Sequence, residues 1–200
     1  MSWHRSGRIA TSDLLGFLPP LFRAVDVKKL HPYPAIWLNR AVKQKKIKRI
    51  IKGFYVNTFK CELSGHWPTL EEIGCFIRSP SYVSREWALS YHGVLGQFPH
   101  ACTMVTLAAS VGLRHEVRVD EFTLEYSKIK KSLFWGFELR DGFLLASPEK
   151  ALLDAIYLSG YIPFADELDT DFLDMERLLE SADQFPAKVQ SVAKEMTRNN

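Results

Sequence analysis

Residues 34–56 read PAIWLNRAVKQKKIKRIIKGFYV, and this stretch decides the fold of the N-terminal third of the chain. Pro34 suits the first position of a helix, because the N–H that proline lacks would have no helical partner there. We therefore predict a helix from Pro34 to Gln44 with one apolar side and one basic side. The apolar side carries Ala35, Leu38, Ala41 and Val42. The outer side carries Ile36, Arg40 and Lys43, flanked by Trp37, Asn39 and Gln44.

Two β-prone runs, residues 47–51 and 54–57, follow this helix and are joined by Lys52-Gly53. A two-residue connection that contains Gly is typical of a β-hairpin. Upstream, Thr11 or Ser12 can cap a short helix that Pro19-Pro20 ends, and a weaker pattern predicts a second helix over 26–30. A basic helix followed by a basic hairpin is typical of the recognition helix and wing of a winged helix-turn-helix.

The outer side of the predicted helix suits the major groove of DNA. Arginine can bind guanine, amide side chains can bind adenine, and an apolar group can contact a thymine methyl. The residues expected to contact bases are Ile36, Asn39, Arg40, Lys43 and Gln44. The residues expected to contact phosphates are Lys45, Lys46, Lys48, Arg49 and Lys52. A solvated basic helix is the simpler alternative, and winged helices also bind RNA and proteins.

Charge is distributed unevenly along the 200 residues, although the net charge is only +3. Residues 1–60 hold half of the 26 Lys and Arg but only two of the 23 acids, Asp13 and Asp26. A basic first third fits a nucleic-acid partner, because neutralised phosphates release counterions. We therefore predict two domains, a winged helix-turn-helix DNA-binding domain over 1–60 and a C-terminal domain over 61–200. Residues 61–68 are expected to form the linker between them.

The C-terminal domain is predicted to be α+β. Helices are expected over 69–78, over 85–92 after Ser84, and from Ser147 to about Gly160. Strands are expected over 103–107, across 117–126, and in a hairpin whose turn is Asp141-Gly142. The overall prediction is an N-terminal winged helix-turn-helix followed by a mixed α/β domain with a small antiparallel sheet and flanking helices. The acidic tail from Asp166 is expected to be helical, either as a solvated face or as a surface for a basic partner.

Catalytic and metal-binding patterns are weak. Ser147-Pro-Glu-Lys150 matches the S-x-x-K pattern of some serine hydrolases, but a helix cap already explains the serine. The six histidines form no HExxH pattern, and neither a P-loop nor a GxGxxG sequence is present, so we expect no catalytic residues, no metal and no cofactor. Cys61, Cys75 and Cys102 are odd in number and form no CxxC pair. Without a secretory signal or a membrane-length apolar run, the expected location is the cytoplasm.

Three stretches together resemble the AbiEi antitoxins of type IV toxin–antitoxin, or abortive-infection, systems. They are IKRIIKGFYV (47–56), YVSREWALSYHG (82–93) and SPEKALLD (147–154), and the resemblance covers roughly residues 8–160. The family-motif residues of the C-terminal domain are Tyr82, Ser84, Tyr91, His92, Gly93, Ser147, Pro148, Glu149, Lys150 and Asp154. The region after this last stretch is shorter than is usual in the family, so parts of the antitoxin domain are expected to be reduced.

The resemblance implies a DNA-binding antitoxin that represses its own operon by binding inverted repeats in double-stranded operator DNA. It also implies that the C-terminal domain counteracts a co-encoded nucleotidyltransferase-like toxin of the AbiEii type, either by direct contact or functionally. Such an antitoxin is not itself expected to be an enzyme, and no membrane partner is expected. The main alternative is a stand-alone winged-helix transcription regulator whose C-terminal domain senses a ligand or a protein.

Overall fold

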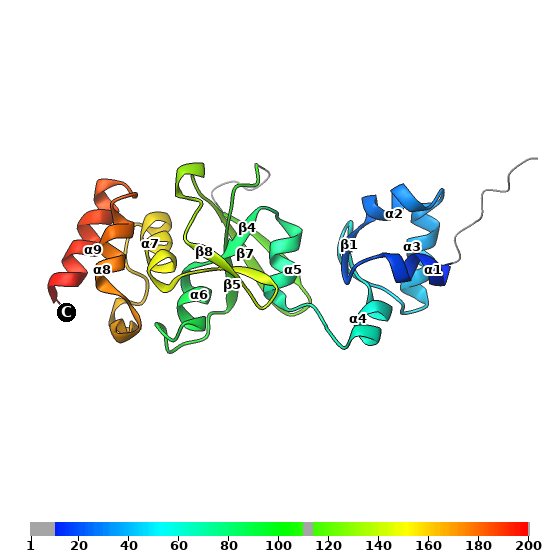
Figure 1. Cartoon of the computed structure of the whole chain (residues 1–200), viewed down its shortest axis with the longest axis horizontal. Helices are drawn as coiled ribbons and strands as arrows, with labels where there is room; N and C mark the ends of the chain where they lie inside the picture. Colours follow the sequence, from blue (N-terminus) through cyan, green and yellow to red (C-terminus); the bar gives the residue numbers. More distant parts are fainter. Residues whose placement is uncertain (1–10, 110–113, 200) are drawn as a thin grey trace, which may run out of the picture. The chain divides into compact units, whose positions relative to one another are not determined.

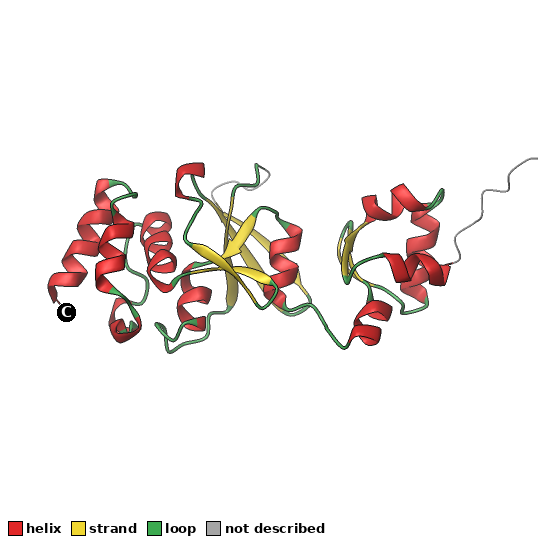
Figure 2. Ribbon diagram, viewed as in Figure 1, coloured by secondary structure: helices red, strands yellow, loops and turns green. Residues whose placement is uncertain are grey.

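The computed structural model describes residues 11–109 and 114–199. The chain forms two compact units, residues 1–69 and residues 70–200 (Figure 1). The described residues hold a mixture of helices and strands arranged in two sheets, which confirms the predicted α+β class (Figure 2). Within this described part of the chain, no helix combines the length and apolar character needed to cross a membrane.

The described part of the N-terminal unit packs four helices with a three-stranded antiparallel sheet. Its elements are α1 (Thr11–Phe17), β1 (Leu21–Arg23), α2 (Ala24–Leu30), α3 (Pro34–Lys43), β2 (Lys48–Ile51), β3 (Phe54–Val56) and α4 (Thr58–Ser64). The strand order is β1-β3-β2. The predicted hairpin is confirmed, and Gly53 adopts a φ of +89° at its turn, where a side chain would be strained. The core collects the apolar side chains Leu14, Leu15, Leu18, Phe22, Val27, Trp37, Leu38, Ala41, Ile47 and Tyr55.

The buried side of α3 differs from the prediction. Pro34 begins the helix as expected, but the buried residues are Trp37, Leu38 and Ala41, while Ala35 and Val42 are exposed. The helix is rotated so that the large indole of Trp37 enters the core, because burying it removes far more apolar surface from water than burying a methyl group.

The boundary of the N-terminal unit also lies further along the chain than predicted. The first half of the expected linker over 61–68 belongs to α4, whose Cys61 is fully buried. The unit therefore ends at Thr69, and not at residue 60.

The C-terminal unit is built on a six-stranded mixed sheet. Its strands are β4 (Ser81–Val83), β5 (Ala101–Thr106), β6 (Arg114–Val119), β7 (Phe122–Lys128), β8 (Phe137–Arg140) and β9 (Phe143–Ala146), in the order β6-β7-β5-β4-β9-β8. The observed sheet is therefore larger than the small antiparallel sheet that was predicted. It is also only partly antiparallel, since β5 pairs with β7 and β4 with β9 in parallel. The three-residue strand β4, which is too short to give a sequence pattern, joins the two halves of the sheet.

Helices cover both faces of this sheet. They are α5 (Leu70–Ile77), α6 (Arg85–Tyr91), α7 (Pro148–Ser159), α8 (Met175–Ala182) and α9 (Ala187–Asn199). Figure 1 shows α5 on one face and α6 with α7 on the other, and α8 and α9 pack behind α7. Along β7 the side chains alternate between these faces: the Tyr126 hydroxyl donates to the Gly74 carbonyl of α5, whereas Glu125 and Ser127 accept from Arg85 of α6.

Candidate functional site

The basic surface of the N-terminal unit comes from α3 and the segment that follows it. All five predicted base-contact residues are exposed, including Ile36, an apolar side chain that is 60 % exposed. They lie opposite the buried residues Trp37, Leu38 and Ala41, so one side of α3 packs while the other faces solvent. Of the predicted phosphate-contact residues, Lys46 is half-buried and Lys45, Lys48, Arg49 and Lys52 are exposed.

The turn from α3 into β2 is held by backbone contacts. Lys45 adopts a left-handed φ of +56°, and its carbonyl accepts from the Thr58 hydroxyl at 2.8 Å. The Lys46 N–H donates to the Ala41 carbonyl, and the Lys46 carbonyl accepts from the Phe59 N–H. The lysine side chains thus project from a backbone that is anchored to both α3 and α4.

A buried polar network forms where β4, α6 and α7 meet. Asp154 is fully buried and accepts hydrogen bonds from the hydroxyls of Tyr82 and Ser84, each at 2.8 Å. The Lys150 ammonium, one turn earlier on α7, contacts the other Asp154 oxygen and donates to the Tyr82 hydroxyl at 2.8 Å. Each charge is therefore paired, and each carboxylate oxygen has a donor.

Burial dominates the electrostatics of this network. It lowers the pKa of Lys150 and raises the pKa of Asp154, while the attraction between the two charges opposes both shifts. Burial beside the Asp154 carboxylate also raises the pKa of Tyr82, so this phenol remains protonated and donates. Three aromatic rings surround the ammonium at 5.2–5.3 Å from their centres, those of Tyr82, Trp135 and Phe185.

This geometry assigns the S-x-x-K pattern a structural role. The Ser147 hydroxyl oxygen accepts from the backbone N–H of Lys150 at 3.2 Å, which caps α7 as predicted, and Pro148 occupies the first turn. The Lys150 side chain donates to Asp154 and Tyr82. Ser84 differs from its expected role, because its hydroxyl binds Asp154 and does not cap α6.

The remaining family-motif residues lie in two other places. The Tyr91 hydroxyl donates to Asp141 at 2.9 Å and His92 Nε2 contacts the Ala146 carbonyl at 2.8 Å, so both residues join the end of α6 to the β8–β9 hairpin. Gly93 follows with a φ of +80°. Glu149 is buried and accepts from the Asp174 N–H at 3.2 Å, and its other oxygen lies 3.8 Å from Arg177 Nε. Only Tyr82, Ser84, Lys150 and Asp154 of the ten form one cluster.

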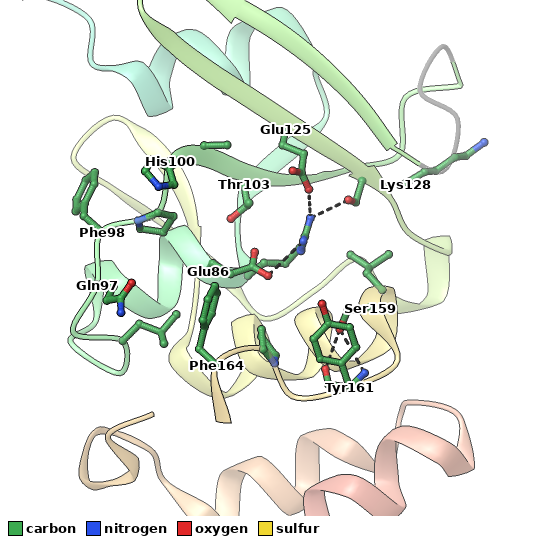
Figure 3. A pocket seen from close by; sticks show the side chains of 17 residues that line it. Glu86, Gln97, Phe98, His100, Thr103, Glu125, Lys128, Ser159, Tyr161 and Phe164 are labelled. Carbon is green, nitrogen blue, oxygen red and sulfur yellow. Dashed lines mark hydrogen bonds and ion pairs between the residues drawn. The ribbon is translucent and has the colours of Figure 1, made fainter. Parts of the chain in front are cut away.

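A pocket of about 820 Å³ lies on the same side of the sheet as α6 and was not predicted (Figure 3). At its base, Arg85 Nη1 donates to Glu125 at 2.5 Å and to the Ser127 hydroxyl at 3.1 Å, and Arg85 Nη2 contacts Glu86 at 3.3 Å. Three aromatic rings stand at its mouth, those of Phe98, Tyr161 and Phe164. The available sequence signal was the polar pair Glu125 and Ser127 in β7, but alternation alone assigns such residues to solvent.

Comparison with models of known protein families gave no match to the chain. Comparison with curated proteins gave no match either.

Proposed function

We propose that this chain is a DNA-binding antitoxin and autorepressor of a type IV toxin–antitoxin operon. The observation that carries the DNA-binding half is the exposed basic side of α3, followed at once by the basic β2–β3 hairpin. The element order α1-β1-α2-α3-β2-β3 supports a winged helix-turn-helix in this proposal, in which α3 would be the recognition helix and the β2–β3 hairpin the wing. The partner in this proposal is double-stranded operator DNA with inverted repeats.

In this mode of binding, α3 enters the major groove. Arg40 can form paired hydrogen bonds to guanine, Asn39 and Gln44 can bind adenine, and Ile36 can contact a thymine methyl. Lysines and arginine of the wing bind phosphates, which orient the protein without reading sequence. The buried side of α3 holds the helix against the core of the unit, so its outer side is presented on a rigid element.

The antitoxin half rests on the resemblance to AbiEi proteins. In this proposal the C-terminal unit counteracts a co-encoded nucleotidyltransferase-like toxin. Tyr82, Ser84, Lys150 and Asp154, which belong to the stretches that carry the resemblance, form the buried network described above. Their role is then to hold β4 and α7 together within the unit that acts on the toxin.

DNA binding is tested by comparing Arg40→Ala with Lys52→Ala. Arg40→Ala should weaken binding to the operator by about 1–3 kcal/mol and reduce the preference for the operator over random duplex, because a base contact is lost. Lys52→Ala should weaken binding to both duplexes alike, because phosphate contacts carry no sequence information. The measurement is a dissociation constant for each duplex from fluorescence anisotropy over a series of salt concentrations.

Lys194→Ala is the matched control, since it removes one exposed positive charge from α9 of the other unit. Its affinity for either duplex should equal that of the wild type. Equal losses on operator and random duplex for Arg40→Ala would contradict base reading by α3, and weak binding without preference in the wild type would overturn the repressor role.

A second candidate function is favoured by the pocket of the C-terminal unit. A stand-alone regulator would use such a pocket to sense a ligand and would need no toxin. The gene next to this one separates the candidates: a nucleotidyltransferase-like reading frame directly downstream favours the antitoxin. Rescue of toxin-expressing cells by the full chain, and its loss in a chain without residues 70–200, tests the antitoxin directly.

A further inference from the structure

The base of the pocket in the C-terminal unit is polar and incompletely satisfied. Arg85 and Glu125 are more than nine-tenths buried, and Glu86 is half-buried beside them. Although the two terminal guanidinium nitrogens of Arg85 bind carboxylates, its Nε has no hydrogen-bond partner among the residues that the structure describes. Oxygen Oε2 of Glu86 has none either. Two consecutive residues at the base thus hold one donor and one acceptor that are each buried without a partner, which is costly unless a ligand supplies the missing contacts.

The mouth of the pocket is aromatic. Phe98, Tyr161 and Phe164 line it and are 73 %, 65 % and 53 % exposed. Figure 3 shows Phe164 and Tyr161 on one side of the pocket and Phe98 with His100 on another, with the Glu86 side chain between them. Three large rings gathered around one opening, and left in water, mark a binding surface for an apolar or flat group.

Two pocket residues hold strained backbone conformations. Arg85 has a φ of +60° and Phe164 a φ of +52°, in the left-handed region that side chains other than glycine, asparagine and aspartate seldom adopt. Such strain is unfavourable and persists where the surrounding structure needs the side chain in a particular position. Here it directs one polar group at the base and one ring at the mouth into the same pocket.

The charges at the base restrict what can bind. A cation would meet the Arg85 guanidinium, and an anion would meet the carboxylates of Glu86 and Glu125. A neutral ligand that donates a hydrogen bond would satisfy the unpartnered oxygen of Glu86, after the Glu86 carboxylate turns about its last, broad torsion. A flat ligand would in addition stack on the rings at the mouth.

We propose that this pocket binds a nucleobase, stacked on Phe164 or Tyr161 and donating an N–H to Glu86. Bases combine a flat ring with neighbouring neutral donors and acceptors, and proteins hold them by stacking on aromatic side chains together with hydrogen bonds to their edges. The volume of about 820 Å³ accommodates a nucleoside. This binding is independent of operator binding by the N-terminal unit, and it gives the C-terminal unit a ligand whether the chain is an antitoxin or a ligand-sensing regulator.

The experiment measures binding of adenosine, guanosine, cytidine and uridine to the full chain by isothermal titration calorimetry and saturation-transfer NMR. At least one nucleoside should bind with one site per chain. Glu86→Gln should weaken that binding about tenfold or more, because an amide replaces a charged acceptor. Phe164→Leu should weaken it about tenfold through lost stacking. Neither variant should change the affinity for operator DNA, so failure here is distinguishable from failure of the DNA-binding proposal.

Phe172→Leu is the matched control, since Phe172 is a similarly exposed ring outside the pocket, and it should bind nucleosides like the wild type. If free nucleosides do not bind but a short single-stranded oligoribonucleotide does, and that binding falls in Phe164→Leu, the proposal holds with a base within a strand as the ligand. Binding of methylguanidine that depends on Glu86, without nucleoside binding, would overturn it. Absence of binding by every probe, or equal losses in Phe164→Leu and Phe172→Leu, would overturn it as well.

Discussion

Asp154 is a buried carboxylate whose hydrogen-bond and charge partners offset the free-energy cost of its burial. Its carboxylate has no exposed surface, and it accepts from Tyr82, Ser84 and Lys150 at once. Burying a charge in this way is strongly unfavourable unless an opposite charge and hydrogen bonds replace water. The network therefore contributes little net stability as a whole, yet the loss of one member leaves its partner uncompensated.

We predict that Asp154→Asn destabilises the chain by about 3–5 kcal/mol, because the Lys150 ammonium then lies buried without a counter-charge. Burial already lowers the pKa of Lys150, so the unfolded chain binds this proton more tightly than the folded chain. The deficit should consequently shrink as pH rises toward the ordinary lysine pKa of 10.5. Urea unfolding of the full chain, followed by tryptophan fluorescence between pH 7 and pH 10, measures both effects.

The exposed Asp166 supplies the control for this prediction, and Asp166→Asn should leave the unfolding free energy unchanged within about 0.5 kcal/mol. An Asp154→Asn chain as stable as the wild type, or a deficit that grows with pH, would show that the ion pair is not what holds this site.

At the scale of elements, Asn57 joins three parts of the N-terminal unit. Its side-chain nitrogen donates to the carbonyls of Leu15 and Leu18 at 2.8 and 3.0 Å, at the end of α1. Its side-chain oxygen caps α4 by accepting from the Lys60 N–H at 3.1 Å, and its own N–H donates to Pro20 at 2.8 Å. One fully buried amide thus satisfies the open ends of two helices just after β3.

Asn57→Ala should therefore lower the unfolding free energy of this unit by about 2–4 kcal/mol, the combined effect of a lost cap and two carbonyls left unsatisfied. Thermal melting followed by circular dichroism checks the loss. Asn39→Ala, an exposed change on α3, should melt like the wild type although it removes a proposed base contact. If both variants melt alike, Asn57 does not act as the joint described here.

At the scale of the whole molecule, the chain is two units with opposite charge balance and separate cores. The packing of the first unit is complete only when α4 is included, because α4 buries Cys61 and its Lys60 ammonium donates to the Gly16 carbonyl at 3.1 Å. The charge asymmetry of the sequence marked the existence of two units correctly. It could not mark their boundary, since α4 itself carries Lys60 and Glu62 and has no distinctive charge.

This boundary predicts that residues 1–69 fold as an isolated fragment and bind operator DNA. Residues 1–60 should melt at a clearly lower temperature, because the cut removes Cys61 and most of α4. A fragment of residues 1–75 should gain nothing further. Circular dichroism melts and two-dimensional NMR spectra of the three fragments provide the comparison, and equal melting of the two shorter fragments would place the boundary at residue 60 after all.

Patterns that depend on neighbouring residues were readable from the sequence. Four such patterns take the predicted conformations. They are the helix start at Pro34, the hairpin turns at Lys52-Gly53 and Asp141-Gly142, and the start of α7 at Ser147-Pro148. Each follows from the backbone preferences of one or two residues, which the rest of the chain does not override. The exposure of the basic residues of α3 followed from helical spacing, although spacing placed Trp37 beside them and not in the core.

Features that depend on distant segments required the tertiary structure. The three residues of β4 form a strand only because β5 and β9 supply hydrogen bonds on both sides. The rotation of α3 that buries Trp37 is set by the core it meets. Arg85 and Glu125 are forty positions apart, and their pairing, like the pocket above them, exists only once α6 crosses the sheet. Local preference is a property of a few adjacent residues, whereas pairing and burial are properties of surfaces that the folded chain brings together.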